Sequence, residues 1–318
     1  MACDGDKTVT AMTTVYITHD DCLLHEMGYG HPECPDRLRA INDYLESTQL
    51  GQLLRHLEPR PVSQSLLAQV HPLTYIDWLD QIQPRAGHIY ADPDTALNRH
   101  SVPAARLAAG AVELATELVL RGDAHNAFCA VRPPGHHAET ATAMGFCLFN
   151  NIAIGIERAL AEPGIERVAV LDFDVHHCNG TIDLYKDRPE VLICSSFQHP
   201  FYPYRYFDIV RPNIINTPLK AGTTGVQFRR AVEAGWLPAL QAHRPDMLFI
   251  SAGFDAHRDD PLGQLLLDET DYAWVSSLIT DAAAGSANGR IVSTLEGGYN
   301  LSALARSVGA YLEVLLGA

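Results

Sequence analysis

Apolar and polar residues alternate along the chain with two periods, which together predict a sheet whose strands are separated by helices. Short apolar runs rich in valine and isoleucine are typical of strands buried on both faces. These runs are residues 15–18, 127–131, 168–175, 191–194, 247–251 and 291–295. Helical spacing predicts a helix that Pro35 opens, one from Pro103 to Gly122, and others near 150–161, 226–243, 270–284 and 301–316. This order favours an α/β fold with one open, mostly parallel sheet, helices on both faces, and a ligand site at the carboxyl ends of the strands.

The rest of the chain offers fewer signals. Residues 60–100 contain prolines at 61, 72, 84 and 93 and are predicted to form a long irregular loop. No repeat or linker-like stretch divides the sequence, so we expect one domain over residues 13–318. Residues 1–12 lack the basic and apolar pattern of a secretory signal and are expected to be a disordered extension. His31 and Arg37, in the polar stretch around Pro35, are expected to be surface or capping groups.

The stretch of residues 168–177 concentrates the chemistry of the chain. Its apolar run leads into two carboxylates and two imidazoles, and in an extended chain Asp172, Asp174 and His176 would project to one side. Unpaired buried carboxylates cost several kcal/mol, so a cation is expected beside them. The alternative is that Asp172 caps a helix, Asp174 pairs with an arginine, and the histidines are solvated.

Composition limits the functions that need to be considered. The 318 residues are 47% hydrophobic and 19% charged, as in ordinary soluble globular proteins. The formal net charge of −15 argues against a basic groove for nucleic acid. No apolar stretch is long enough to span a bilayer, so no membrane partner is expected. The seven cysteines include no Cys-x-x-Cys pair, which argues against a disulfide framework and favours a cytoplasmic location.

Polar groups follow four of the predicted strands, and parallel strands would bring them to one edge. They are His136 and His137, the pair Asp174 and His176, Asp255, and Tyr299. A catalytic zinc takes three protein ligands and keeps one position open, and Asp174, His176 and Asp255 meet that count. His136 and His137 then remain for proton transfer. Tyr299 follows Gly297 and Gly298, on a turn expected to be flexible, from which its hydroxyl could reach a developing oxyanion.

Five longer motifs carry a resemblance to a known family. They are RPPGHHA at 132–138, GFCLFNN at 145–151, DFDVHHCNGT at 172–181, GFDAHRDDPLG at 253–263 and LEGGYN at 295–300. In this order they resemble the zinc-dependent histone deacetylase family, in particular class II and its bacterial amidohydrolase relatives. The resemblance extends over about residues 15–316 and implies the arginase/deacetylase-like fold.

The resemblance also implies roles for individual residues. Asp174, His176 and Asp255 would bind one catalytic Zn²⁺. His136 and His137 would shuttle protons, Tyr299 would polarise the acyl carbonyl, and Asp172 and Asn179 would support the two histidines. Phe146, with Phe201 or Tyr202, would wall a tunnel for the acyl-lysine stem. Asp172, Asp174, His176 and Ser195 resemble a structural potassium site.

The resemblance predicts hydrolysis of an acetyl-amine amide, most simply ε-acetyl-lysine in peptides or proteins, with sensitivity to hydroxamates. Polyamine-preferring members can carry a glutamate where this chain has Leu262, a further tunnel residue, so the leucine favours acyl-lysine or a small neutral amide. An acetylpolyamine amidohydrolase, an arginase-like binuclear manganese hydrolase and a non-catalytic acyl-lysine binding module are the alternatives.

Cys178 is a departure from the family pattern, because most relatives have glycine there. It could be a rival zinc ligand or, as is more common, a buried free cysteine. If a left-handed backbone is needed at this position, the loop geometry differs. His177 is expected to be packed or hydrogen-bonded and His257 to lie in a loop. Loops at 19–35 and 71–100 could form the rim of the site or the interface of a homo-oligomer.

Overall fold

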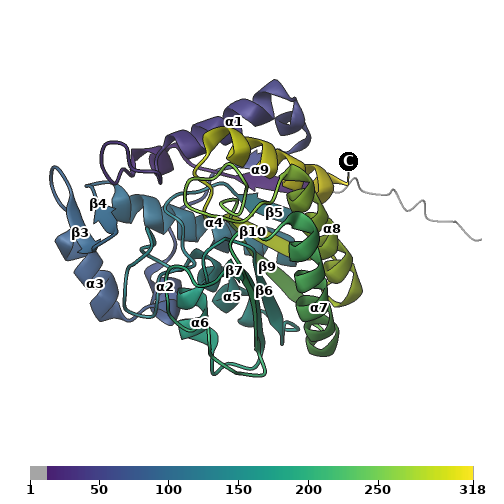
Figure 1. Ribbon diagram of the computed structural model, residues 1–318. Coiled ribbons are helices and arrows are strands. Elements are labelled where there is room, and N and C mark those ends of the chain that lie inside the picture. The colour runs from purple at the N-terminus through teal and green to yellow at the C-terminus, as the bar shows by residue number, and fades with distance from the viewer. Residues whose placement is uncertain (1–12, 318) are drawn as a thin grey trace, which may run out of the picture.

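Eight parallel strands form the sheet at the centre of the protein (Figure 1). The structure, a computed structural model, describes residues 13–317, so the prediction for residues 1–12 lies outside the described part. The strand order is β2-β1-β5-β10-β9-β6-β7-β8, and every neighbouring pair is parallel. The strands are β1 (Thr14–Ile17), β2 (Arg55–Leu57), β5 (Asn126–Cys129), β6 (Val168–Asp172), β7 (Val191–Gln198), β8 (Ile214–Leu219), β9 (Met247–Ala252) and β10 (Ile291–Leu295). The predicted open α/β sheet is confirmed.

Helices cover both faces of this sheet. On one face α1 packs against α9, α9 against α8, and α8 against α7; on the other, α4 packs against α5 and α5 against α2 (Figure 1). The helices are α1 (Asp36–Ser47), α2 (Gln64–Val70), α3 (Leu73–Ile82), α4 (Ser101–Arg121), α5 (Asn151–Leu160), α6 (Asn179–Tyr185), α7 (Gly225–His243), α8 (Glu269–Ser286) and α9 (Leu301–Leu316). Short 3₁₀ helices span Asp20–Leu24 and Leu50–Leu53. No helix in residues 13–317 is long and apolar enough to cross a membrane.

Polar caps explain where several helices begin. Asn150 accepts a hydrogen bond from the Ala153 amide at the start of α5, and Asn300 accepts one from Ala303 at the start of α9. Helix α4 begins at Ser101 rather than at the predicted Pro103. A proline in the first turn is tolerated because its missing N–H would have had no helical partner.

The prediction of a long loop over residues 60–100 was wrong. This segment contains α2, α3 and an antiparallel hairpin of β3 (Ile89–Asp92) and β4 (Thr95–Leu97). Ser63 caps α2 by accepting a hydrogen bond from the Leu66 amide, and Pro72 immediately precedes α3. The prolines thus lie between the elements, where they mark boundaries and break nothing.

The order of the sheet decides where the functional groups meet. Strands β5, β10, β9 and β6 are consecutive neighbours, and they are the four strands that precede the polar motifs. Asp172, the last residue of β6, is in register with Ser251 of β9 and Ser195 of β7. The carboxyl ends of these strands therefore open onto one common edge, as the sequence predicts.

Candidate active site

Asp174, His176 and Asp255 form a cluster beyond the ends of β6 and β9. Each can offer one ligand atom, and these atoms all lie within 4.8 Å of one another. His176 Nδ1 is 3.0 Å from Asp174 Oδ1 and 3.1 Å from Asp255 Oδ2. The two aspartates are buried, whereas the His176 side chain keeps 12% exposure. The three residues expected to bind a metal are thus brought together with one side open.

The backbone route to this cluster differs from the prediction. Strand β6 ends at Asp172, so the chain is not extended through residue 175 as expected. Asp172 Oδ1 accepts a hydrogen bond from the Asp174 amide at 3.1 Å, and Asp174 Oδ1 accepts one from the His176 amide at 2.8 Å. Aspartates stabilise such turns by bonding to an amide two residues on. Two successive turns, and not strand alternation, aim these side chains.

The electrostatics of the cluster fit a cation. Burial, together with the negative charge of Asp174, raises the pKa of Asp255 to about 7. Asp255 Oδ2 is buried and has no hydrogen-bond partner, although Asp255 Oδ1 accepts one from the Val175 amide. A β-carbon at Gly253 or Gly297 would collide with the Asp174 or Asp255 carboxylate. Two carboxylates therefore converge, and one of their oxygens has a lone pair that no donor uses. Glycines at 253 and 297 leave the space for them, and such a group is suited to a divalent metal ion.

His136 and His137 lie beside this cluster with their rings 4.0 Å apart, centroid to centroid. His136 Nδ1 is 2.9 Å from Asp172 Oδ2, and His137 Nδ1 is 2.7 Å from Asn179 Oδ1. Burial alone would lower the pKa of His136, but the charges of Asp172 and Asp174 raise it to about 10. Burial and the neighbouring histidines hold the pKa of His137 well below its usual value. The two imidazoles therefore have opposite pKa shifts, and His137 is the one that burial keeps neutral.

Tyr299 reaches the same cavity from a turn that is firmly held. Its amide donates a 2.6 Å hydrogen bond to Asp260 Oδ2, and Arg37 donates to the carbonyl oxygens of Glu296 and Gly298. The Arg37 guanidinium also lies 4.9 Å from the centre of the Tyr299 ring. The turn is thus anchored on both sides, in contrast to the flexible turn expected from its glycines.

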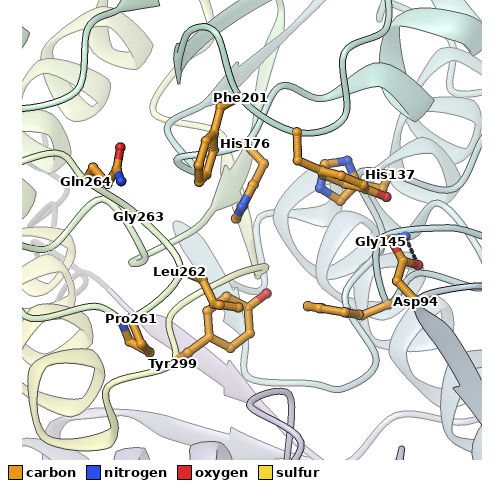
Figure 2. A pocket seen from close by; sticks show the side chains of 12 residues that line it. Asp94, His137, Gly145, His176, Phe201, Pro261, Leu262, Gly263, Gln264 and Tyr299 are labelled. Carbon is orange, nitrogen blue, oxygen red and sulfur yellow. Dashed lines mark hydrogen bonds between the residues drawn. The ribbon is translucent and has the colours of Figure 1, made fainter.

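A cavity of about 370 Å³ leads from the surface to these groups. Figure 2 shows Phe201 and His176 on one side of it, across from Leu262 and Tyr299. The lining residues are Asp94, His137, Gly145, Phe146, His176, Phe201, Tyr202, Pro261, Leu262, Gly263, Gln264 and Tyr299. All four residues expected in the tunnel wall therefore line the cavity.

Phe201 and Tyr202 both contribute, so the choice between them was unnecessary. The Phe201 ring stacks on His176 at 5.4 Å with 17° between the planes. The Tyr202 ring meets His137 edge-on at 5.2 Å. Phe146 meets Tyr299 edge-on at 6.0 Å. Aromatic rings thus surround the reactive groups.

The β3–β4 hairpin supports the Phe146 side of the cavity. Phe146 has a left-handed backbone with φ of 68°, which is strained for a bulky residue. Asp94 Oδ1 accepts from the Gly145 amide at 2.9 Å, and Thr95 Oγ1 accepts from the Phe146 amide at 3.1 Å. Both supporting residues lie in the segment predicted to be an irregular loop, which is why the sequence did not reveal them.

Two buried carboxylates near the site were also missed. Glu296 accepts hydrogen bonds from the Gly135 and His136 amides and from Ser251, and so fixes the backbone that carries the paired histidines. Glu33 forms ion pairs with Arg132 and Arg37, all three fully buried. Arg37 is thus not the surface or capping group that was expected. The available signal was a glutamate inside each motif, Glu33 in the stretch 31–37 and Glu296 in LEGGYN at 295–300.

The structure resolves the question about Cys178. Its φ is −78°, so no left-handed backbone is needed, and it lies buried at the start of α6. Burial raises the pKa of its thiol well above the usual value, and the only metal-binding group found among residues 13–317 excludes it. His177 is packed against Phe197 and lies 3.1 Å from Asn216 Oδ1, as expected. His257 lies between β9 and α8 and is buried.

Asp172 and Ser195, expected at a potassium site, lie side by side on β6 and β7. Ser195 Oγ is buried and has no hydrogen-bond partner. The side chains of the other two expected members, Asp174 and His176, belong to the Asp-His-Asp cluster.

Fold and site together define an α/β protein with a parallel sheet, a buried Asp-His-Asp group that could hold a metal ion, and two histidines supported by Asp172 and Asn179. Known proteins that resemble this chain carry the same kind of domain. Residues 31–315 match the histone deacetylase domain. The chain is 40% identical to the uncharacterized protein slr0245 of Synechocystis, over 92% of this chain and 96% of that one. It is 37% identical to the histone deacetylase-like amidohydrolase of Pseudomonas aeruginosa, over 85% and 73% of the two chains.

A solved structure gives the same answer. The HD domain of HDA15 superposes with a TM-score of 0.90 at 34% identity, covering 96% of this chain and 90% of that one. The chain belongs to the histone deacetylase family.

Proposed function

We propose that the protein is a zinc-dependent amidohydrolase that removes the acetyl group from ε-acetyl-lysine in peptides or proteins. The observation that carries this proposal is the aromatic cavity that ends at His137, His176 and Tyr299. Its walls fit a thin apolar stem with an amide at its tip, and its floor supplies groups for proton transfer.

The residues of the chain would divide the reaction as follows. Asp174, His176 and Asp255 would hold Zn²⁺, which supplies Lewis-acid activation of water and of the amide carbonyl. Neutral His137 would take the proton from the attacking water, and a protonated histidine of the pair would return one to the leaving amine. The hydroxyl of Tyr299 would donate to the oxygen that becomes negative, because burial raises its pKa and keeps it protonated.

A monovalent cation is part of the proposal. We infer that Asp172, Asp174, His176 and Ser195, whose buried hydroxyl has no hydrogen-bond partner, belong to a structural K⁺ site. A cation there would compensate the buried charge of Asp172, whose pKa burial would otherwise raise. The cytoplasmic location expected from the cysteines belongs to the same proposal, as do acetylated amines as partners and the possible homo-oligomer.

The alternatives have less support. Acetylpolyamine hydrolysis would be favoured by an acidic residue at position 262, where the cavity wall carries Leu262. A binuclear manganese centre would need further carboxylates, and only one three-residue group is found among residues 13–317. A binding module would have no use for two histidines with opposite pKa shifts.

The test is turnover of the zinc-loaded protein on an ε-acetyl-lysine peptide and on an acetylated polyamine, side by side, with a hydroxamate as inhibitor. We expect hydroxamate-sensitive turnover of the peptide. Tyr299→Phe should lower kcat by about 10²–10³-fold, as for loss of one oxyanion donor. Preference for the polyamine would overturn the substrate class, and normal turnover by Tyr299→Phe would overturn the role of the tyrosine.

A further inference from the structure

The orientation of the Asn179 side chain decides which nitrogen of His137 carries a hydrogen. Asn179 Oδ1 lies 2.7 Å from His137 Nδ1, and a carbonyl oxygen can only accept. In this arrangement His137 must therefore donate from Nδ1, which leaves a lone pair on Nε2. That lone pair is what a general base needs.

An amide can turn over by 180°, and then its NH₂ group would face His137. The imidazole would have to accept at Nδ1 and carry its hydrogen on Nε2, which blocks the base. The oxygen and nitrogen of an amide are told apart by their partners. The partners of Asn179 therefore determine whether His137 can act.

Glu139 is the partner that fixes this orientation. Its Oε1 accepts a hydrogen bond from Asn179 Nδ2 at 2.8 Å. The carbonyl oxygen of His137 at 3.4 Å and Met144 Sδ at 3.3 Å are further acceptors on the same side. None of the three groups can donate, so the NH₂ end of Asn179 must point toward them. The shortest contact, to a buried carboxylate, supplies most of the preference.

Glu139 is itself held from the surface. Its Oε2 pairs with Arg205 Nη1 at 2.8 Å, and half of the Arg205 side chain is exposed. Arg205 follows closely on Phe201 and Tyr202, which line the cavity. One carboxylate oxygen of Glu139 thus faces Asn179 and the other faces Arg205. Glu139 thereby links the loop that carries Phe201 and Tyr202 to the residue that supports His137.

We propose that Glu139 is a positioning residue for His137: it orients the Asn179 amide and so keeps the imidazole in the tautomer with a free Nε2. The inference rests on the proposed function for the role of His137 as base. The tautomer itself depends only on the contacts among Glu139, Asn179 and His137.

The first test is Glu139→Gln. Its side-chain amide cannot accept from both Asn179 and Arg205, so the preference for one orientation of Asn179 weakens. We expect kcat on the acetyl-lysine peptide to fall about 10-fold, as is common when such a supporting partner is lost, with KM unchanged. Asp187→Asn is the matched control, because it removes the exposed partner of Arg211, an arginine of the same loop. It should leave kcat unchanged.

A second variant, Asn179→Asp, distinguishes an effect of Glu139 on the orientation of Asn179 from a general loss of structure. In Asn179→Asp both side-chain oxygens accept, so no wrong orientation exists, and the NH₂ group of Glu139→Gln can donate to the new carboxylate. In the Asn179→Asp background Glu139→Gln should therefore raise kcat or lower it by less than about 2-fold, against a loss of about 10-fold in the parent. An equal loss in both backgrounds would mean that Glu139 acts only on structure, and would overturn the proposal.

The ¹⁵N shifts of His137 give a readout independent of turnover. With labelled histidine, and with His137→Gln to assign the signals, the parent protein should show a protonated Nδ1 and an unprotonated Nε2. Glu139→Gln should shift this population toward a protonated Nε2. Unchanged shifts would overturn the proposal even if activity fell. If the parent hydrolysed neither acetyl substrate, the proposed function would fail while the shifts still tested the role of Glu139.

Discussion

Replacing Glu33 by glutamine should destabilise the protein more than most single substitutions. Glu33 lies just before α1 and has no exposed surface. It accepts from Arg132, at 2.6 Å between Nη2 and Oε2, and from Arg37 Nη1 at 3.2 Å. Both arginines are fully buried, so Glu33→Gln leaves two guanidinium charges in the interior without their counter-ion.

Breaking a buried ion pair by removing one partner costs about 3–5 kcal/mol, because the remaining charge stays desolvated. Two cations share Glu33, which places the expected loss in the upper part of that range. Asp36→Asn is the matched control. Asp36 pairs with Arg39 at 2.6 Å, but both side chains are more than half exposed. An exposed pair contributes about 0–1 kcal/mol, so this variant should behave like the parent.

The loss should depend on pH in a defined direction. Burial alone would raise the pKa of Glu33, but Arg132 and the nearby His25 hold it well below its usual value of 4.5. A lowered carboxyl pKa stabilises the folded state fully above the unfolded pKa, and the contribution disappears as the pH falls below it. The difference in stability between parent and Glu33→Gln should therefore be largest near neutral pH and shrink below about pH 4.5.

Urea unfolding at pH 7 and at a series of lower pH values measures both the loss of stability and its pH dependence. The dependence of the unfolding free energy on urea concentration should be the same for all variants. Turnover should fall as well, because Arg37 also holds the carbonyl oxygens of Glu296 and Gly298, just before Tyr299. If Glu33→Gln and Asp36→Asn lose equally little stability at pH 7, the buried network does not have the energetic role assigned to it.

Three further predictions concern the metal group and the tunnel. Gly297→Ala would push a methyl group into the Asp174 and Asp255 carboxylates, and calorimetry should detect no zinc binding by this variant. Gly285→Ala, in open space on α8, is the control: it should bind zinc normally and gain about 0.4–1 kcal/mol of stability. Chelation should remove turnover, and added Zn²⁺ should restore it; turnover that persists in the chelated protein would contradict a metal-dependent reaction. Leu262→Glu should raise kcat/KM for an acetylated polyamine relative to the acetyl-lysine peptide, because it adds a negative charge to the cavity wall; an unchanged ratio would show that this position does not select substrates.

The sequence was sufficient for the interior of the sheet and insufficient for its margins. Continuous apolar runs such as 168–171 stand out because both faces of a central strand are buried. Strand β8 (Ile214–Leu219) lies at an edge and includes Asn216, Thr217 and Pro218, so it lacks apolar contrast. Strand β2 is only three residues long. Edge strands depend on the neighbour they pair with, which local pattern does not reveal.

The same distinction holds at the site. Asp174, His176 and Asp255 were recognisable because charged groups directly after a buried strand need a partner. Asp94 and Glu139 were not, since their roles come from single contacts to Gly145 and Asn179, 51 and 40 residues away in the chain. Nothing in the local sequence of a supporting residue says which distant amide it will meet.

The β3–β4 hairpin stands outside the eight-stranded sheet, yet it fixes the backbone of Phe146 at the tunnel wall. The wall of the cavity near Phe146 and the reactive groups at the base of the cavity therefore depend on separate segments of the chain. A lineage can alter the acyl groups it admits by changing this peripheral ribbon, while the strand ends that carry the reactive groups stay as they are. Substrate range and chemical step are free to evolve at different rates in such an architecture.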